Sequence, residues 1–264
     1  MKYIVLQKKI LLALLVVLLF SCASRKDIVY YQDIDTMNGA NKVTSYEIKI
    51  QPDDLLSIIV SAEDPEIAAP FNLRSVSLQS SNDMDQVGGQ PTNQLYLVDA
   101  SGFIAFPVLG KLKVGGLTRT AVLGLLYEKI GGYIKNPIVN MRIANFKVSV
   151  QGEVAMPGSY TIASERITLI EALSRAGDLT VYGKRNTILI IREIDGVKSF
   201  NRVDITKADF IHSPFYYLAQ NDVVYVEPNK SKINGAAVGP NTGVIISITS
   251  ILITLVTLVL SSSK

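Results

Sequence analysis

The sequence predicts an α+β protein built of two small units, followed by an apolar C-terminal helix. Three observations support this. Short alternating strand patterns such as Ile138–Ile143 recur between turn residues. Each unit holds one helical pattern, at residues 119–133 and 169–176. Near the end of the chain, Gly243–Leu260 contains no charged residue. A chain of 264 residues has room for two such units.

The first unit covers residues 45–146. Its strand patterns lie at Tyr46–Gln51, Leu55–Val60, Leu95–Val98, Phe103–Val108, Leu109–Val114 and Ile138–Ile143. We expect Leu95–Val98 and Phe103–Val108 to form a hairpin, and Thr118 to cap the helix. Asp53 and Asp54 follow a proline between two strands, which predicts turn residues rather than an acid–base pair.

The second unit covers residues 147–228. Its strand patterns lie at Lys147–Val154, Ser159–Ile162, Asn186–Arg192, Val197–Val203 and Asp222–Glu227. Thr168 is the expected N-cap of its single helix, and Gly177 the expected stop. Residues 229–242 are rich in small residues and Asn, which predicts a linker.

The N-terminus is typical of a secretory signal. Lys2, Lys8 and Lys9 precede an apolar run, Ile10–Phe20, that is too short for a comfortable membrane span. We therefore expect residues 1–21 to be a signal peptide. Residues 22–44 are polar, which predicts a tether with little structure of its own.

The signal ends in Leu19-Phe20-Ser21-Cys22, which resembles the lipobox of bacterial lipoproteins. This resemblance implies that Cys22 becomes the mature N-terminus and carries a diacylglycerol thioether. Several acyl chains on one residue give stable anchoring, because each buried CH2 contributes about 0.8 kcal/mol. Ala23 rather than Asp follows the cysteine, which by resemblance to the lipoprotein sorting rule implies delivery to the outer membrane.

Composition excludes several function classes. The formal charge is +3, but without the three signal lysines the chain has 23 basic and 23 acidic residues. A nucleic-acid binder is expected to keep a basic excess. One Cys and one His exclude intrachain disulfides and clustered Cys/His metal sites. His212 has no accompanying nucleophile motif, so we predict a surface role, no catalytic residue and no cofactor besides the lipid on Cys22.

We predict that residues 243–261 form a transmembrane helix, because 18 uncharged residues give a helix of about 27 Å. Its hydroxyl residues follow a 3-4-3-4 spacing and share an arc of roughly 80°. They are Ser247, Ser250, Thr254, Thr257 and Ser261. Two interpretations stay open. The stripe can line a water-filled space between several helices, or the helix can be a tail anchor whose hydroxyls bond back to their own carbonyls.

The two units resemble the polysaccharide export domain and the SLBB (soluble-ligand-binding β-grasp) domain of bacterial outer-membrane exporters. The matching stretches of the first are Tyr46–Ile58, Val98–Gly110, Gly116–Thr118 and Asn136–Val139. Those of the second are Val148–Val154, Pro157–Tyr160, Thr168–Gly177 and Leu218–Val226. The order of domains, with a lipobox before and an apolar helix after, follows the family.

The resemblance implies a homo-oligomeric ring of lipoproteins that exports capsular or extracellular polysaccharide. Its bulk would lie in the periplasm, with an inner-membrane copolymerase as partner and a barrel of C-terminal helices across the outer membrane. We then expect the hydroxyl stripe to face the lumen. The chain departs from Wza-like members in having one SLBB domain instead of two, and Asp53 where the family usually has Gly.

Alternatives to this function remain. The protein can be a non-conducting scaffold that binds periplasmic glycan, and the terminal helix can lie in the inner membrane. Basic residues of the second unit can contact an anionic sugar or a neighbouring subunit, although solvated surface charges are the favoured interpretation. They are Arg166, Arg175, Lys184 and Arg192.

Overall fold

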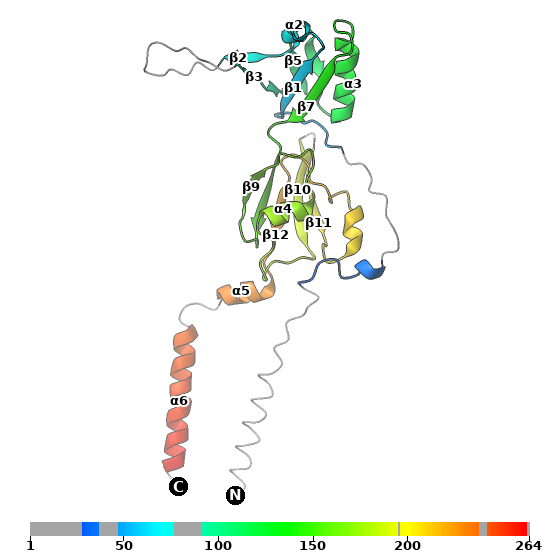
Figure 1. Ribbon diagram of the computed structural model, residues 1–264. Helices are drawn as coiled ribbons and strands as arrows, with labels where there is room; N and C mark the ends of the chain where they lie inside the picture. The colour runs from blue at the N-terminus through cyan, green and yellow to red at the C-terminus, as the bar shows by residue number, and fades with distance from the viewer. Residues whose placement is uncertain (1–27, 37–46, 77–90, 195, 238–241, 263–264) are drawn as a thin grey trace, which may run out of the picture.

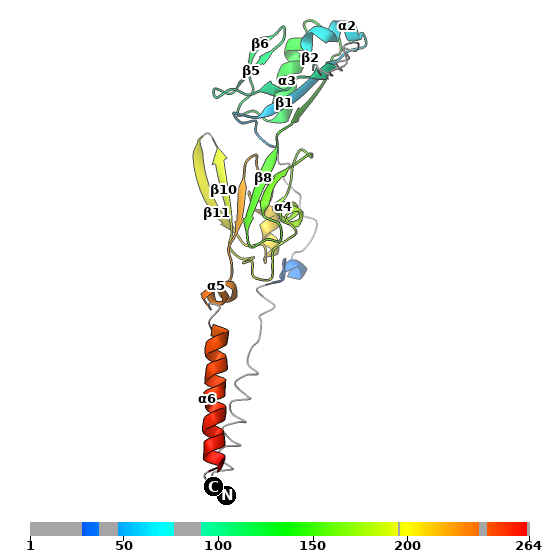
Figure 2. The same ribbon diagram turned by 90° about the vertical axis from the view of Figure 1, so that its left-hand side faces the viewer.

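The computed structural model describes residues 28–36, 47–76, 91–194, 196–237 and 242–262. Two domains lie in series along the long axis of the molecule (Figure 1, Figure 2). The first domain comprises residues 47–144 and the second domain residues 145–229. The C-terminal helices lie beyond the second domain, at the end opposite the first.

The first domain is built on a three-stranded antiparallel sheet of order β4-β1-β7. Its strands are β1 (Leu55–Ser61), β4 (Tyr96–Leu97) and β7 (Ile138–Ile143). Helix α3 (Arg119–Ile130) packs against β7 and buries Val122, Leu126 and Ile130, which share one helical face. Thr118 caps α3 as predicted, because its hydroxyl accepts a hydrogen bond from Ala121 N at 3.3 Å.

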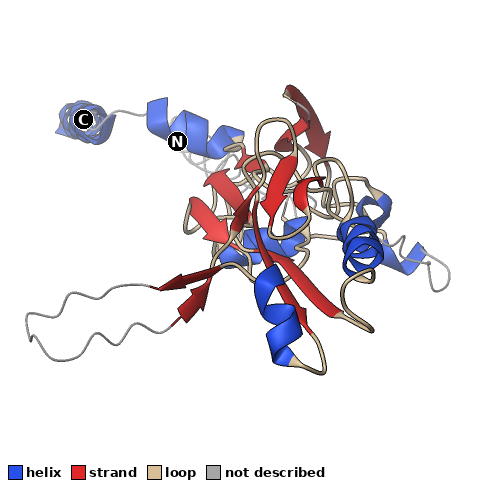
Figure 3. Cartoon of the chain, turned by 90° about the horizontal axis from the view of Figure 1, so that it is seen from above, coloured by secondary structure: helices blue, strands red, loops and turns tan. Residues whose placement is uncertain are grey.

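Two hairpins and a short helical segment complete this domain. They are β2 (Arg74–Val76) with β3 (Pro91–Asn93), β5 (Phe103–Phe106) with β6 (Gly110–Lys113), α2 (Pro65–Ala68) and η3 (Ala69–Phe71). The β2–β3 hairpin projects sideways from the domain (Figure 1, Figure 3).

Two strand predictions for this domain are wrong. Residues 47–50 form no strand, and Lys49 makes only an isolated bridge to Thr118. The predicted hairpin of Leu95–Val98 with Phe103–Val108 is absent, because β4 pairs with β1 and β5 pairs with β6. The tight turn that joins β5 to β6 contains Val108 at φ 64°. Local alternation predicts a strand but does not identify its partner.

The second domain is a five-stranded sheet of order β11-β10-β12-β8-β9. Its strands are β8 (Lys147–Gly152), β9 (Gly158–Thr161), β10 (Ile188–Ile194), β11 (Val197–Val203) and β12 (Val223–Val226). Strands β12 and β8 are parallel, and all other neighbours are antiparallel. The short η4 (Ala208–His212) lies between β11 and β12 in the chain.

Helix α4 (Leu169–Arg175) packs on one face of this sheet (Figure 1). Thr168 and Glu171 form a capping box at its start, since each side chain bonds the other residue's main-chain N–H. The core below α4 contains Leu169 and Leu173 from the helix and aliphatic residues of three strands. These are Val148, Val150, Ile188, Ile190, Val224 and Val226.

A segment before the first domain is docked on the second domain. This segment, residues 28–36, is called the strap and includes η2 (Ile34–Thr36). Tyr31 N donates to Ile205 O at 3.2 Å, and Gln32 N donates to Thr206 O at 2.7 Å. Tyr30 and Tyr31 pack against the second core. The lead at residues 22–44 was expected to have little structure, and the strap corrects this expectation for residues 28–36.

The C-terminal part holds two helices, α5 (Lys230–Ala237) and α6 (Thr242–Ser262). Helix α5 lies where a linker was predicted, and Asn229 Oδ1 accepts a bond from Lys232 N in its first turn. The predicted C-terminal helix is present as α6. Within the residues that the structure describes, however, no helix has both the length and the apolar character needed to cross a membrane. The prediction is therefore confirmed for the helix and not for the crossing.

Candidate functional site

Helix α6 presents aliphatic side chains that the rest of the described chain leaves exposed. Val244, Ile246, Ile248, Ile251, Leu252, Ile253, Leu255 and Leu258 are between 52% and 65% exposed. The helix extends away from both domains (Figure 1, Figure 2). A contiguous apolar surface of this kind marks a site of contact with lipid or with other protein chains.

The hydroxyl stripe on α6 is bonded to the helix's own backbone. Ser247 donates to Gly243 O, Ser250 to Ile246 O, Thr254 to Ser250 O and Thr257 to Thr254 O, each at 2.8 Å. Thr249, outside the stripe, donates to Ile246 O at 3.1 Å. Back-bonding satisfies the hydroxyl protons within one helix, as the tail-anchor interpretation requires.

Back-bonding leaves these hydroxyl oxygens able to accept further hydrogen bonds. A hydroxyl that donates its proton keeps two lone pairs, so it can still accept a bond from water or from a sugar. The stripe thus offers neutral acceptors without a fixed charge. Two predicted site residues lie outside the described part of the chain: Cys22, the predicted lipid site, and the side chain of Ser261.

The four basic residues of the second domain occupy different environments. Arg192 is 7% exposed and forms an ion pair with the fully buried Asp222, with Nη2 at 2.7 Å from Oδ2 and Nε at 3.0 Å from Oδ1. Burial raises the pKa of the Asp222 carboxyl, while Arg192 opposes this shift. Arg192 is therefore a core residue and neither a solvated charge nor a sugar contact.

The other three basic residues are more accessible. Lys184 pairs with Glu227 at 3.1 Å, and Arg166 lies over the Tyr217 ring at 5.2 Å. Arg175 is an exposed residue at the end of α4. These positions do not converge on one site, which agrees with the favoured interpretation of separate surface charges.

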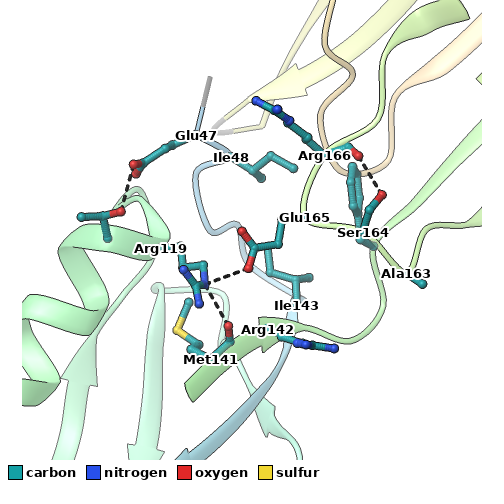
Figure 4. Close-up of a pocket in the computed structure, with 12 residues that line it drawn as sticks. Glu47, Ile48, Arg119, Met141, Arg142, Ile143, Ala163, Ser164, Glu165 and Arg166 are labelled. Atoms are coloured by element: carbon teal, nitrogen blue, oxygen red, sulfur yellow. Dashed lines mark hydrogen bonds and ion pairs between the residues drawn. The ribbon is translucent and has the colours of Figure 1, made fainter. Parts of the chain in front are cut away.

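A cavity of about 490 Å³ lies between the two domains (Figure 4). Arg119 at the start of α3 and Glu165 from the second domain meet across it, with Nε at 3.3 Å from Oε1. The same Nε donates to Met141 O at 2.9 Å. Glu47 lies on the first-domain side, where the hydroxyls of Thr118 and Thr120 lower the pKa of its carboxyl.

The side-chain amides of Asn145 and Gln220 form hydrogen bonds at the junction between the two domains. Asn145 Oδ1 accepts from Leu55 N and Asn145 Nδ2 donates to Asp53 O, both at 2.9 Å. Gln220, 2% exposed, donates to Asn145 O at 2.9 Å and accepts from Lys147 N at 2.8 Å. One short segment is thereby bonded to both domains, which restricts their relative rotation.

Asp54 is a buried acid that sequence reasoning assigned to a turn. Its carboxyl is fully buried, Oδ2 accepts from Gln51 N at 2.8 Å, and Oδ1 has no partner. Burial raises the pKa of Asp54 to about 6, and the neighbouring Asp53 adds to the shift. Asp53 is the turn residue, exposed and at φ 67°. The strand pattern that begins at Leu55 indicates that one of the two acids points inward, because Asp54 has the same parity as the buried Leu56 and Ile58.

His212 is exposed at the end of η4, as predicted. Among the described residues, no three His, Cys, Asp or Glu side chains are grouped to hold a metal ion.

The geometry defines the class first: the protein has two small α+β domains in series, followed by a helix with exposed aliphatic side chains. Comparison with known proteins then identifies the family. Residues 42–144 match the family model described as polysaccharide biosynthesis/export protein. Residues 146–226 match the SLBB domain. The chain therefore belongs to the polysaccharide biosynthesis/export proteins with an SLBB domain.

Two curated relatives carry the same printed name, EPS I polysaccharide export outer membrane protein EpsA. The protein of Ralstonia solanacearum is 30% identical over 218 residues, which are 80% of this chain and 56% of the relative. The protein of Ralstonia nicotianae is 36% identical over 155 residues, which are 57% of this chain and 39% of the relative. The chain thus spans about half the length of the curated relatives it matches.

Proposed function

We propose that this protein forms a homo-oligomeric ring that exports capsular or extracellular polysaccharide at the outer membrane. The lipid on Cys22 would anchor each copy, with both domains in the periplasm and an inner-membrane copolymerase as partner. Two findings support the proposal. The chain belongs to the export family, and the described relatives are named outer membrane export proteins.

The exposed surface of α6 is the observation that carries the assembly step. Its aliphatic side chains are 52% to 65% exposed, and contact of apolar surface with water costs about 25 cal/mol per Å². In a ring they would face neighbouring helices and lipid. We propose that Ser247, Ser250, Thr254, Thr257 and Ser261 then face the interior. Neutral hydroxyls suit the passage of a sugar polymer, because they exchange bonds with water and sugar at little net cost.

A native mass measurement tests the assembly. The full chain is extracted gently with its acyl chains intact, and the mass of the particle is compared with the mass of one chain. A closed oligomer supports the ring. A single copy, or surface glycan that is undiminished after deletion of residues 242–264, contradicts the conduit.

A cysteine scan tests the direction of the stripe. Each of positions 247, 250, 254 and 257 is changed to cysteine in turn and exposed to a membrane-impermeant thiol reagent. Ile248→Cys and Leu252→Cys are the matched controls on the aliphatic side. Labelling confined to the stripe supports an aqueous interior, and labelling that ignores the stripe contradicts it.

The back-bonded hydroxyls favour a second candidate function. A helix whose Ser and Thr protons are satisfied internally can anchor one copy without forming a wall. The protein would then be a non-conducting scaffold that binds glycan, in the outer or the inner membrane. The same mass measurement separates the two, because the scaffold requires no oligomer.

A further inference from the structure

The end of the second domain that lies away from the first is built by segments from three parts of the chain. Strands β8 and β12 run parallel, and both lead from the domain junction toward this end. The loops that follow them, and helix α5, are therefore located there (Figure 1, Figure 2). The strap lies at the same end.

This end carries a group of exposed apolar side chains, which we call the basal face. Its members and their exposed fractions are Val181 63%, Met156 57%, Ile233 52%, Ile28 43% and Tyr182 42%. Main-chain bonds hold these segments together: Met156 N donates to Ala176 O at 2.8 Å, and Asn229 N donates to Tyr182 O at 2.7 Å. The strap is fixed beside them, because the Tyr30 hydroxyl donates to Asp178 Oδ1 at 2.6 Å.

The chain segments that flank the basal face, Cys22 on one side and α6 on the other, indicate which surface this face contacts. Cys22 precedes Ile28 by six residues, which span at most about 20 Å when fully extended. Helix α6 leaves from the same end of the domain. Both apolar ends of the mature chain thus start within a short distance of this one face, and the first domain points away from it.

We propose that the basal face rests on the lipid surface that holds the acyl chains of Cys22. This inference relies on the proposed lipidation. Its side chains suit the boundary between headgroups and acyl chains, because Tyr182 has an apolar ring with a polar tip and Val181 beside it in the chain is aliphatic. Lys232 Nζ lies 5.2 Å from the centre of the Tyr182 ring and 3.5 Å from Glu153 Oε1. Its alkyl stem can lie along lipid while its charge stays in water.

The absence of tryptophan from the sequence permits a direct test. A single tryptophan is introduced by Tyr182→Trp or by Val181→Trp in the full lipidated chain. Tyr133→Trp is the matched control, because Tyr133 is 62% exposed in the first domain, far from the basal face. Each variant is reconstituted in phospholipid vesicles whose acyl chains are brominated near the headgroup, and fluorescence is compared with unbrominated vesicles.

We expect brominated lipid to lower the fluorescence at positions 181 and 182 roughly twofold or more, since interfacial side chains enter the outer 5–10 Å of the apolar region. Fluorescence at position 133 should not change. Equal fluorescence in both lipids at 181 and 182 overturns the proposal. Quenching of equal strength at position 133 also overturns it, because the effect would then not depend on the basal face.

The same samples separate this proposal from the proposed function. Mass spectrometry of the N-terminal peptide reports the lipid on Cys22, and native mass reports the ring. Quenching in a lipidated single copy supports the basal face and contradicts the ring. An oligomer without quenching supports the ring and contradicts the basal face.

Discussion

Gln220 holds the main chain of Asn145 at the point where the two domains meet. Its amide nitrogen donates to Asn145 O at 2.9 Å, and its amide oxygen accepts from Lys147 N at 2.8 Å. The two bonds fix the start of β8 from a loop more than seventy positions later in the chain. The buried Gln220 amide therefore helps to fix the relative orientation of the domains, together with the Asn145 side chain and the Arg119–Glu165 ion pair.

We expect Gln220→Ala to loosen this junction. The substitution removes two half-buried hydrogen bonds, at a cost of about 0.5–1.5 kcal/mol each. Hydrogen exchange at Lys147, measured on the full chain, should accelerate. Gln151→Ala is the control, because Gln151 is an exposed glutamine of the same strand. Unchanged exchange at Lys147 contradicts the role assigned to Gln220.

Breaking the Arg192–Asp222 pair should lower the stability of the second domain strongly, whereas replacing both residues by apolar ones should lower it little. Asp222→Ala leaves the Arg192 guanidinium buried without its carboxylate, which is expected to destabilise the second domain by about 3–5 kcal/mol. The double variant Arg192→Met with Asp222→Leu should recover much of this loss. Urea unfolding followed by circular dichroism gives the measurement.

The exposed pair on the adjacent turn of the hairpin is the control for this experiment. Lys198 Nζ and Glu193 Oε2 are 3.7 Å apart on the surface. Glu193→Gln should therefore change stability by less than about 1 kcal/mol. An equally small effect of Asp222→Ala would show that the buried pair is not stabilising the core.

Asp54 should make the stability of the first domain depend on pH. Its pKa is about 6 in the folded chain and 3.8 in its ordinary state. Between these values the folded chain binds a proton that the unfolded chain has lost. The free energy of unfolding therefore falls as the pH rises through this window, and it levels off above about pH 6.

We expect Asp54→Asn to remove this dependence and to stabilise the domain near neutral pH by at most about 3 kcal/mol. Urea unfolding at about pH 5 and about pH 8 compares the variant with the parent. Glu63→Gln serves as control, since Glu63 is an exposed acid of the same domain. The same slope in the parent and in Asp54→Asn would assign the titration to another group.

Tyr30→Phe should release the strap. The change removes the bond from the Tyr30 hydroxyl to Asp178, and burial together with Asp178 raises the pKa of this tyrosine, so the group is neutral at all ordinary pH values. A hydrogen bond to a carboxylate contributes about 1.5–3 kcal/mol. Exchange of the Tyr31 and Gln32 amides should accelerate. Tyr133→Phe, at an exposed tyrosine, should leave both amides unaffected.

Local signals in the sequence predicted the helices of both domains well. Thr118 and Thr168 each precede an apolar pattern of helical period, and both cap helices as expected. The pairing of strands was less predictable. Leu95–Val98 is followed by turn residues and a second strand pattern, yet β4 pairs with β1, because the choice between partners is made by the core.

The pairing of buried polar groups was the feature that the sequence predicted least well. Arg192 and Asp222 carry no local signal of their pairing, since 30 positions separate them. Tyr30 and Tyr31 are the only aromatic residues of a polar lead, and that contrast could have predicted docking. For the candidate site, the hydroxyl spacing on α6 placed the stripe on one face, whereas its back-bonding depends on rotamers that a sequence does not contain.

The parallel pairing of β8 with β12 determines how the second domain meets a mechanical load. The first domain is attached at the start of β8, and α5 and α6 are attached beyond the end of β12. Tension between these two attachments would slide one strand along the other. The hydrogen bonds that join Val223–Val226 to Ser149–Gly152 would then be loaded together instead of breaking one after another. A force on the terminal helix is therefore applied to the sheet in shear, the direction in which the paired strands resist it most.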